Sequence, residues 1–253
     1  MSSAPVNGEL AGRVIAITGA TGGIGRALCL AAAAQGAQLV LLARTERKLR
    51  ALHAELELLA PGAALMAPFD LEKALAQDYD RIADAIEQRH GRLDGLVHCA
   101  AQLGTLTPIE QYDVPAWCRV MHVNLTAAFA LTQVLLPVLR KSADASVIFT
   151  TSSVGRKGRA YWGAYAVSKF AVEGLSQVLA DELSGTTKFR VNAINPGKVR
   201  TAMRRQAYPS ENLLSLPLPE TVVEPYLKLL GPRGAGITGQ SLDSQPAESA
   251  PST

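Results

Sequence analysis

A tyrosine and a lysine four residues apart, Tyr165 and Lys169, are the side chains of this sequence best suited to proton transfer. On a helix that spacing puts both side chains on one face, one turn apart, so the Lys169 ammonium lies near the phenolic oxygen. An ordinary tyrosine has a pKa of about 10 and is a poor base at neutral pH, whereas a fixed positive charge nearby favours the phenolate. The pair is therefore predicted to exchange a proton with a carbonyl or alcohol oxygen.

Ser152 precedes Tyr165 with twelve residues between them, and it follows an apolar run, residues 146–150, that is predicted to be a strand. Its hydroxyl is expected to hydrogen-bond the reacting oxygen and to stabilise the charge that develops there. Tyr161 has no lysine four residues further on, so it is assigned to packing or to the rim of the substrate site. Because Tyr-x-x-x-Lys spacing is common on helix surfaces, the surrounding elements must support the interpretation.

A glycine-rich turn follows the first predicted strand, residues 14–18, and leads into an amphipathic helix. In this context glycines permit a tight turn, close approach of the backbone to a pyrophosphate, and packing of the helix on the sheet. The helix N-terminus adds unpaired N–H groups and a favourable dipole. The turn therefore predicts a dinucleotide site that includes Gly19, Thr21, Gly23, Ile24 and Gly25.

The choice of dinucleotide depends on Arg44, at the end of the second predicted strand. An NAD-binding unit usually carries an acidic residue there for the ribose 2′-hydroxyl, and this chain has none. A guanidinium suits a 2′-phosphate, so NADP(H) is favoured over NAD(H); the alternative is an exposed arginine that opens the next helix. Asp70, with Leu71 beside it, is placed to accept from the adenine amino group or to cap a following helix.

Apolar runs of strand length alternate with helical stretches, which predicts a single α/β domain of the doubly wound Rossmann type. Its mostly parallel sheet of about seven strands is expected to be covered by helices on both faces. The strands that we can locate are residues 14–18, 38–42, 64–68, 96–99, 146–150 and 190–194, and the helices 24–35, 46–59, 74–89, 117–141 and 162–183. The domain is predicted to span 11–244 with a substrate flap at 202–219, between a flexible segment 1–10 and a disordered tail 245–253.

The composition excludes several classes of protein. The chain of 253 residues is 48% hydrophobic with a net charge of +3, and its basic residues are scattered, which argues against a nucleic-acid partner. Its three cysteines form no Cys-x-x-Cys pair, so neither a disulfide framework nor a metal site is expected. The run 120–139 lacks charged residues, but its polar residues indicate a buried helix and no membrane span. No secretory signal is seen, and a cytoplasmic location is expected.

Together these motifs resemble the short-chain dehydrogenase/reductase superfamily from about Leu10 to Leu242, and most closely its bacterial YciK-type oxidoreductases. The subgroup likeness lies in residues 155–160, 162–165 and 200–204. The resemblance implies that Asn124 holds a water in a proton relay that reaches Lys169; by residue type alone, a buried amide satisfied by backbone is the alternative. It also implies that Lys169 touches the nicotinamide ribose and that the nicotinamide is bound by Pro196, Gly197 and Thr201.

Two segments depart from the family pattern. Where the family reads Asn-Asn-Ala-Gly, this chain reads His98-Cys99-Ala100-Ala101; Ala100 keeps its predicted place beside the cofactor, while Ala101 adds a methyl group. His98 and Cys99 are not expected to bind a metal together, because neighbouring strand residues point to opposite faces. Residues 242–245, Leu-Asp-Ser-Gln, replace a common Val-Asp-Gly-Gly ending.

The sequence therefore predicts an NADP(H)-dependent oxidoreductase that acts on a small carbonyl or alcohol substrate and forms a homodimer or homotetramer through its apolar helices. The alternative is an NADP(H)-binding sensor or interaction protein with little turnover, suggested by Ala101. A sugar-nucleotide epimerase or dehydratase fits less well, because little chain remains after Thr201 for a larger substrate domain.

Overall fold

The computed structural model describes residues 8–185 and 189–246. A seven-stranded sheet forms its centre, in the order β3-β2-β1-β4-β5-β6-β7, and every pair of neighbours is parallel. The strands are β1 Val14–Thr18, β2 Gln38–Ala43, β3 Ala64–Pro68, β4 Gly95–His98, β5 Ala145–Thr150, β6 Phe189–Asn195 and β7 Ser241–Asp243. The predicted doubly wound fold is confirmed. The one strand without a predicted location, β7, is short and partly exposed, so it lacks the apolar run that marks the others.

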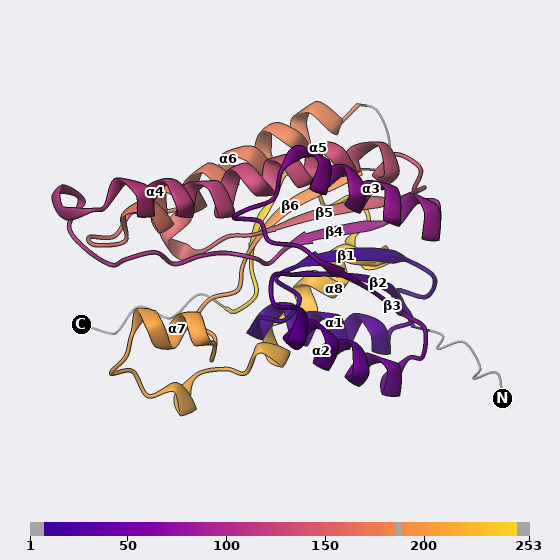
Figure 1. Ribbon diagram of the computed structural model, residues 1–253, viewed down its shortest axis with the longest axis horizontal. Helices are drawn as coiled ribbons and strands as arrows, with labels where there is room; N and C mark the ends of the chain where they lie inside the picture. Colours follow the sequence, from indigo (N-terminus) through magenta and orange to yellow (C-terminus); the bar gives the residue numbers. More distant parts are fainter. Residues whose placement is uncertain (1–7, 186–188, 247–253) are drawn as a thin grey trace.

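Helices cover both faces of the sheet (Figure 1). One face packs on α1, α2 and α8, and the other on α3, α5 and α6, so the sheet separates two hydrophobic cores. Strands buried on both faces are mostly apolar, as in β1 and β5. The helices are α1 Gly23–Ala34, α2 Glu46–Leu59, α3 Ala76–His90, α4 Val114–Met121, α5 Ala127–Leu139, α6 Gly163–Leu183, α7 Ala202–Ala207 and α8 Glu224–Leu230.

The predicted continuous helix over 117–141 is interrupted in the structure. A π-helical turn, His122–Thr126, separates α4 from α5. The whole stretch, Val114–Leu139, is long and apolar enough to cross a membrane by length and composition, but half of its most apolar window is buried inside the protein. Leu131, Leu135 and Leu139 of α5 are fully buried in the core, so the apolarity of this stretch is explained by packing.

Residues near both ends of the described chain contact the rest of the protein. Leu10 is fully buried, and Glu9 pairs with Arg233. Gln245 donates hydrogen bonds to two backbone carbonyls. Residues 1–7 and 247–253, which include most of the predicted flexible segment and tail, lie outside the described residues. The predicted domain boundaries, 11 and 244, stay a prediction.

The point where a ligand is expected follows from the strand order. β1 lies between β2 and β4, so the chain leaves β1 toward one edge of the sheet and later returns to build toward the other. The loops after β1 and β4 diverge there and leave a crevice at the carboxyl ends of the strands. The segment with α7, residues 200–219, projects beside this end of the sheet (Figure 1).

Candidate active site

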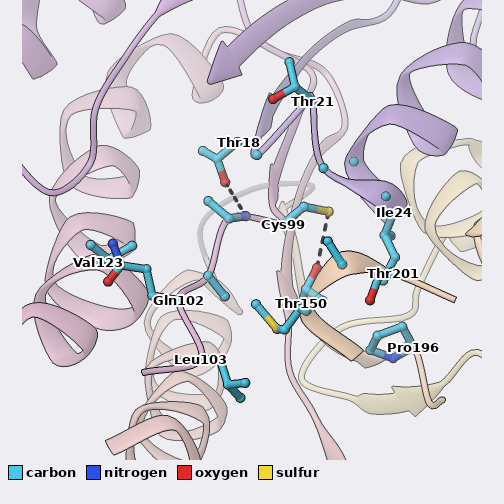
Figure 2. A pocket seen from close by; sticks show the side chains of 18 of the residues that line it. Thr18, Thr21, Ile24, Cys99, Gln102, Leu103, Val123, Thr150, Pro196 and Thr201 are labelled. Carbon is cyan, nitrogen blue, oxygen red and sulfur yellow. Dashed lines mark hydrogen bonds between the residues drawn. The ribbon is translucent and has the colours of Figure 1, made fainter. Parts of the chain in front are cut away.

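A cleft of about 450 Å³ lies at the carboxyl ends of β1, β4 and β5. Its walls come from the glycine-rich turn, from the loops that follow five strands, and from α6 and α7. Figure 2 shows part of this lining, with Thr21 of the turn, Gln102 after β4 and Pro196 after β6. All but one of the predicted site residues line it: Gly19, Thr21, Gly23, Ile24, Gly25, Arg44, Asp70, Leu71, Ala100, Ser152, Tyr165, Lys169, Pro196, Gly197 and Thr201. The exception is Asn124. The fold thus gathers side chains that the sequence spreads over 183 positions.

The glycine-rich turn is fixed against the loop after β4. Gly19 has a φ of +65°, which favours glycine, and a Cβ there would lie 2.8 Å from the backbone nitrogen of Ala100. That nitrogen donates to Thr18 Oγ1 at 3.2 Å (Figure 2). α1 then begins at Gly23 with no side-chain cap and no acidic residue in its first turn. Its first N–H groups therefore face the cleft without an intrahelical acceptor, as a pyrophosphate site requires.

Basic side chains gather where the cleft passes the end of β2. The Arg44 side chain is 64% exposed, and its nearest acidic atom is Glu72 Oε2 at 3.9 Å. Glu72 instead accepts a hydrogen bond from Gln102 Nε2 at 2.9 Å, which leaves the guanidinium available. Lys48, in the first turn of α2, lines the same end of the cleft. Sequence reasoning did not select Lys48, because nothing marks it except its position four residues after Arg44.

Asp70 serves locally as a turn-forming residue while it lines the cleft. Its Oδ1 accepts from the backbone nitrogen of Glu72 at 3.1 Å, and its carbonyl accepts from residues 73 and 74. The helix that follows begins only at Ala76. Asp70 therefore caps the short turn before α3, and its role toward adenine stays a prediction.

Tyr165 and Lys169 lie one turn apart near the start of α6, and both are buried. The Lys169 Nζ lies 5.6 Å from the centre of the Tyr165 ring and donates to the Thr150 carbonyl at 2.7 Å. Burial raises the pKa of Tyr165 to about 12, and its hydrogen bond with Ser152 opposes that rise. Burial also lowers the pKa of Lys169 to about 8. The expected lowering of the Tyr165 pKa by Lys169 is therefore not seen, because the ammonium is directed at Thr150 and desolvation dominates.

Lys169 is bonded to a cluster of polar side chains that consists of Thr150, Tyr226 and Cys99. Thr150, the last residue of β5, offers its carbonyl to Lys169, while its hydroxyl accepts from Tyr226 Oη at 3.2 Å and contacts Cys99 Sγ at 3.4 Å. Figure 2 shows the contact of Cys99 with Thr150. Tyr226, on α8, is fully buried. The sequence offered no signal for Tyr226, since its partner lies 76 residues earlier.

The loop that carries Ser152 packs directly on α6. A Cβ on Gly155 would lie 2.8 Å from Lys169 Cβ and 2.9 Å from its carbonyl oxygen. Only glycine fits that approach without displacing backbone. Gly155 therefore sets the distance between the Ser152 loop and the helix that carries Tyr165.

Asn124 acts on the backbone of a neighbouring loop. Its Oδ1 accepts from the Gln102 nitrogen at 2.7 Å, and its Nδ2 donates to the Gln102 carbonyl at 2.9 Å and to Ser168 Oγ at 3.0 Å. These bonds occupy both donors of the amide. The side chain therefore behaves as the buried, backbone-satisfied amide that was the alternative interpretation. It joins the π-helical turn to the loop after β4, and its part in a proton relay stays a prediction.

The turn after β6, residues 195–198, is fastened to the C-terminal segment. Asp243 binds Asn195 Nδ2 at 2.7 Å and also receives both Arg156 Nη1 contacts at 2.9 Å. Gln245 Nε2 donates to the carbonyls of Pro196 at 2.7 Å and Lys198 at 2.9 Å. The segment 241–245 thus links the Ser152 loop, through Arg156, to the turn that carries Pro196 and Gly197. Gln245 makes these contacts at a position where the family ending has glycine.

Replacing Gln245 by alanine is expected to raise KM for NADPH about three- to tenfold while kcat changes little. Each lost hydrogen bond is worth about 1 kcal/mol, and the turn that it holds lines the cleft. Steady-state kinetics and NADPH fluorescence titration measure the change. The matched control is Gln240→Ala, whose side chain bonds only Thr238 O and lies outside the cleft lining. Equal effects of the two substitutions would contradict the role given to Gln245.

The side chains of His98 and Cys99 are held by contacts within the protein. The ring of His98 stacks on Phe149 at 4.9 Å and shares a hydrogen bond with Thr132 Oγ1 at 2.9 Å. Burial lowers the pKa of His98 to about 3, so the ring is neutral. Cys99 bonds Thr150, on the next strand. No group of three or more His, Cys, Asp or Glu side chains suited to a metal occurs within 8–185 and 189–246. The Ala101 methyl packs on the apolar cluster around Tyr165.

Comparison with known proteins agrees with this geometry. Residues 13–212 match the short chain dehydrogenase family, and the chain belongs to that family. It is 44% identical to the oxidoreductase YciK of Escherichia coli K12, with 92% of each chain covered. A short chain dehydrogenase structure from Pseudomonas syringae is 52% identical, with a TM-score of 0.92 over 96% of this chain and 98% of that one. A Shigella flexneri 2a structure, 42% identical with a TM-score of 0.90 over 95% and 100%, was solved in complex with NADP. The predicted family and its YciK-type subgroup are confirmed.

Proposed function

We propose that this protein is an NADP(H)-dependent oxidoreductase that interconverts a carbonyl and an alcohol on a small molecule. The observation that carries the proposal is the placement of the Tyr165 phenol, hydrogen-bonded to Ser152 and one turn from Lys169, in the wall of a cleft whose far end offers Arg44. NADP bound to a relative of 42% identity supports the choice of cofactor. The free thiols of Cys29, Cys99 and Cys118 favour a cytoplasmic enzyme.

The residues present fit a dinucleotide phosphate. The uncapped start of α1 and the positive-φ turn at Gly19 suit a pyrophosphate. The exposed guanidinium of Arg44 and the nearby Lys48 suit an additional phosphate. When bound, the cofactor supplies hydride chemistry that side chains lack. The chain must then hold the reacting carbonyl and move its proton.

The pKa of Tyr165 suits this residue to carbonyl reduction, in which it must donate a proton. With a pKa of about 12, Tyr165 is a phenol at neutral pH and can donate its proton to a carbonyl oxygen. The Ser152 hydroxyl hydrogen-bonds the same oxygen and stabilises the charge that develops there. Lys169, with a pKa of about 8, carries its charge at neutral pH and loses it above that value. For alcohol oxidation, Tyr165 must first be deprotonated. The rate of alcohol oxidation is therefore expected to increase with pH.

A broad screen of ketones, aldehydes and alcohols with NADPH and NADP⁺ tests the proposal. NADPH consumption that requires a carbonyl substrate is the supporting result. Tight cofactor binding without turnover of any compound would instead favour the NADP(H)-binding sensor. The catalytic arrangement of Ser152, Tyr165 and Lys169 argues against that second function, and no feature of the described residues favours it.

The exposed apolar side chains of α5 and α6 support a homo-oligomer. Phe129 on α5 and Phe170 on α6 are each nearly half exposed, together with Val167 and Val178. Side chains of this size, exposed in a group on neighbouring helices, are typical of a subunit contact. We therefore propose a homodimer or homotetramer.

Phe170→Glu is expected to shift the protein to a smaller assembly in analytical ultracentrifugation, because a carboxylate would be buried in the contact without a partner. Leu58→Glu is the control, since Leu58 is 89% exposed on α2, on the opposite side of the sheet. A wild-type protein that sediments only as a monomer would remove the proposal.

A further inference from the structure

The two ends of the cleft differ in the charged side chains that line them. At the end formed by the loops after β2 and β3, the lining includes Arg44, Lys48, Asp70 and Glu72. At the Tyr165 end, the charged side chains that line it within the described residues are Lys169 and Arg204. Lys169 is buried and bonded to the Thr150 carbonyl. The electrostatic character of the substrate end therefore depends on Arg204.

Arg204 is already paired. It lies on α7 and donates through Nε and Nη2 to the two carboxylate oxygens of Glu211, each at 2.5 Å. Its guanidinium also stacks on the ring of Tyr208, 3.8 Å from the ring centre. A bidentate carboxylate contact neutralises the charge and occupies the planar donor fork. Arg204 is therefore poorly suited to bind an anionic group of a substrate.

A second cation nearby, Arg159, is kept outside the cleft. It donates to the hydroxyl of Tyr208 at 2.5 Å and lies over the Trp162 ring, 5.8 Å from the ring centre. Trp162 lines the cleft, whereas Arg159 and Tyr208 do not. The indole therefore separates the guanidinium from the substrate space.

The remaining wall around Tyr165 is apolar. Leu103 and Ala101 follow β4, Trp162 precedes α6, and Met203 and Ala207 lie on α7; all of them belong to the hydrophobic cluster that contains Tyr165. The ring of Trp162 lies 5.8 Å from that of Tyr165. Burial of an apolar group against such a wall is favourable, whereas burial of a charged group there costs free energy.

We propose that the substrate is a carbonyl compound with an uncharged, apolar body, such as an aryl or alicyclic ketone or aldehyde, and that the Arg204–Glu211 pair excludes 2-oxo acids. The inference rests on the proposed function and adds the substrate class. In the reaction, the carbonyl carbon gains a hydride from NADPH, the oxygen gains a proton from Tyr165, and NADP⁺ and an alcohol result.

The test uses pairs of ketones that differ by one carboxylate. Acetophenone and benzoylformate share the phenyl ring and the carbonyl, and butanone and 2-oxobutanoate form an aliphatic pair. We expect kcat/KM with NADPH to be at least about 100-fold higher for the uncharged member of each pair, because an unpaired carboxylate in an apolar site costs several kcal/mol. A preference for the 2-oxo acids would overturn the proposed substrate class and leave the oxidoreductase function standing.

Glu211→Gln tests the cause of the preference. The substitution keeps the size of the side chain and frees the charge of Arg204, so the ratio of kcat/KM for benzoylformate to that for acetophenone is expected to rise about tenfold. Glu220→Gln is the control, since Glu220 is exposed nine residues further along the chain and does not line the cleft. An unchanged ratio in Glu211→Gln would show that the pair does not set the selectivity.

Calorimetry separates the two proposals if no ketone is reduced. Acetophenone and benzoylformate are titrated into the protein saturated with NADP⁺, where no reduction takes place. Tighter binding of acetophenone without turnover in the NADPH assay would uphold the ligand class and overturn the oxidoreductase function. Tighter binding of benzoylformate, or no binding of either ketone, would overturn the ligand class.

Discussion

Tyr165→Phe is expected to lower kcat for carbonyl reduction by about 10²- to 10⁴-fold, the range that a positioned general acid contributes. Under the proposed function the phenol, which lines the cleft, donates the proton, and its pKa of about 12 keeps it protonated at neutral pH. Removing one oxygen leaves the ring in place among Leu103, Trp162 and Ala166. The fold and the affinity for NADPH are therefore expected to persist, and the loss is expected in kcat.

The measurement needs a tyrosine that lies nearby and outside the proton-transfer pair. Tyr161 is 60% exposed four residues earlier, and its backbone carbonyl accepts from Thr107. Tyr161→Phe should therefore retain the wild-type rate. NADPH fluorescence titration of both variants separates lost chemistry from lost cofactor. A Tyr165→Phe enzyme that stays near full activity would show that the proton comes from another group.

The sequence predicts the catalytic pair because its information is local. A four-residue spacing on one helix already determines that Tyr165 and Lys169 share a face. The doubly wound fold and the dinucleotide site at the first turn are predicted similarly, from alternating apolar runs and from the glycines. The expected lowering of the Tyr165 pKa by Lys169 could not be predicted correctly. The direction of the Lys169 ammonium depends on Thr150, and the Tyr165 pKa depends on burial. Neither is contained in the spacing.

Two residues whose contacts the sequence does not reveal, Tyr226 and Gln245, depend on partners far away in the chain. Tyr226 reaches Thr150 from α8, and Gln245 reaches the turn after β6 from the segment that follows β7. Asn124 illustrates the same limit, since its residue type predicts a buried polar group but not that Gln102 is its partner. The π-helical turn that carries it also has no breaker residue to mark it. Such features become visible only when the tertiary contacts are known.

The charge pattern of the cleft unites the cofactor and substrate proposals. Arg44 and Lys48 are exposed at the β2 end of the cleft, beside two carboxylates. The cation that lines the Tyr165 end, Arg204, is bonded to Glu211. We therefore expect a phosphate to bind at the β2 end and an uncharged group at the Tyr165 end. Under both proposals, the reactive end of the dinucleotide lies against the apolar wall.

Arg44→Ala is expected to raise KM for NADPH about 10- to 100-fold, because a hydrogen bond between charged groups is worth about 1.5–3 kcal/mol. KM for NADH should change little, since that cofactor lacks the 2′-phosphate. The side chain is exposed and only loosely associated with Glu72, so stability should be unaffected. The kcat should also be retained, because Arg44 lies at the end of β2, away from Tyr165.

The neighbouring helix provides the control for this substitution. Arg47 is exposed three residues further on and does not line the cleft, whereas Lys48 does. Arg47→Ala should therefore leave both KM values unchanged, and Lys48→Ala should weaken NADPH binding less than Arg44→Ala. Raising the salt concentration should narrow the difference between NADPH and NADH, since exposed charges are screened. If Arg44→Ala weakened NADH and NADPH equally, Arg44 would be acting on the turn itself and the phosphate would be recognised elsewhere.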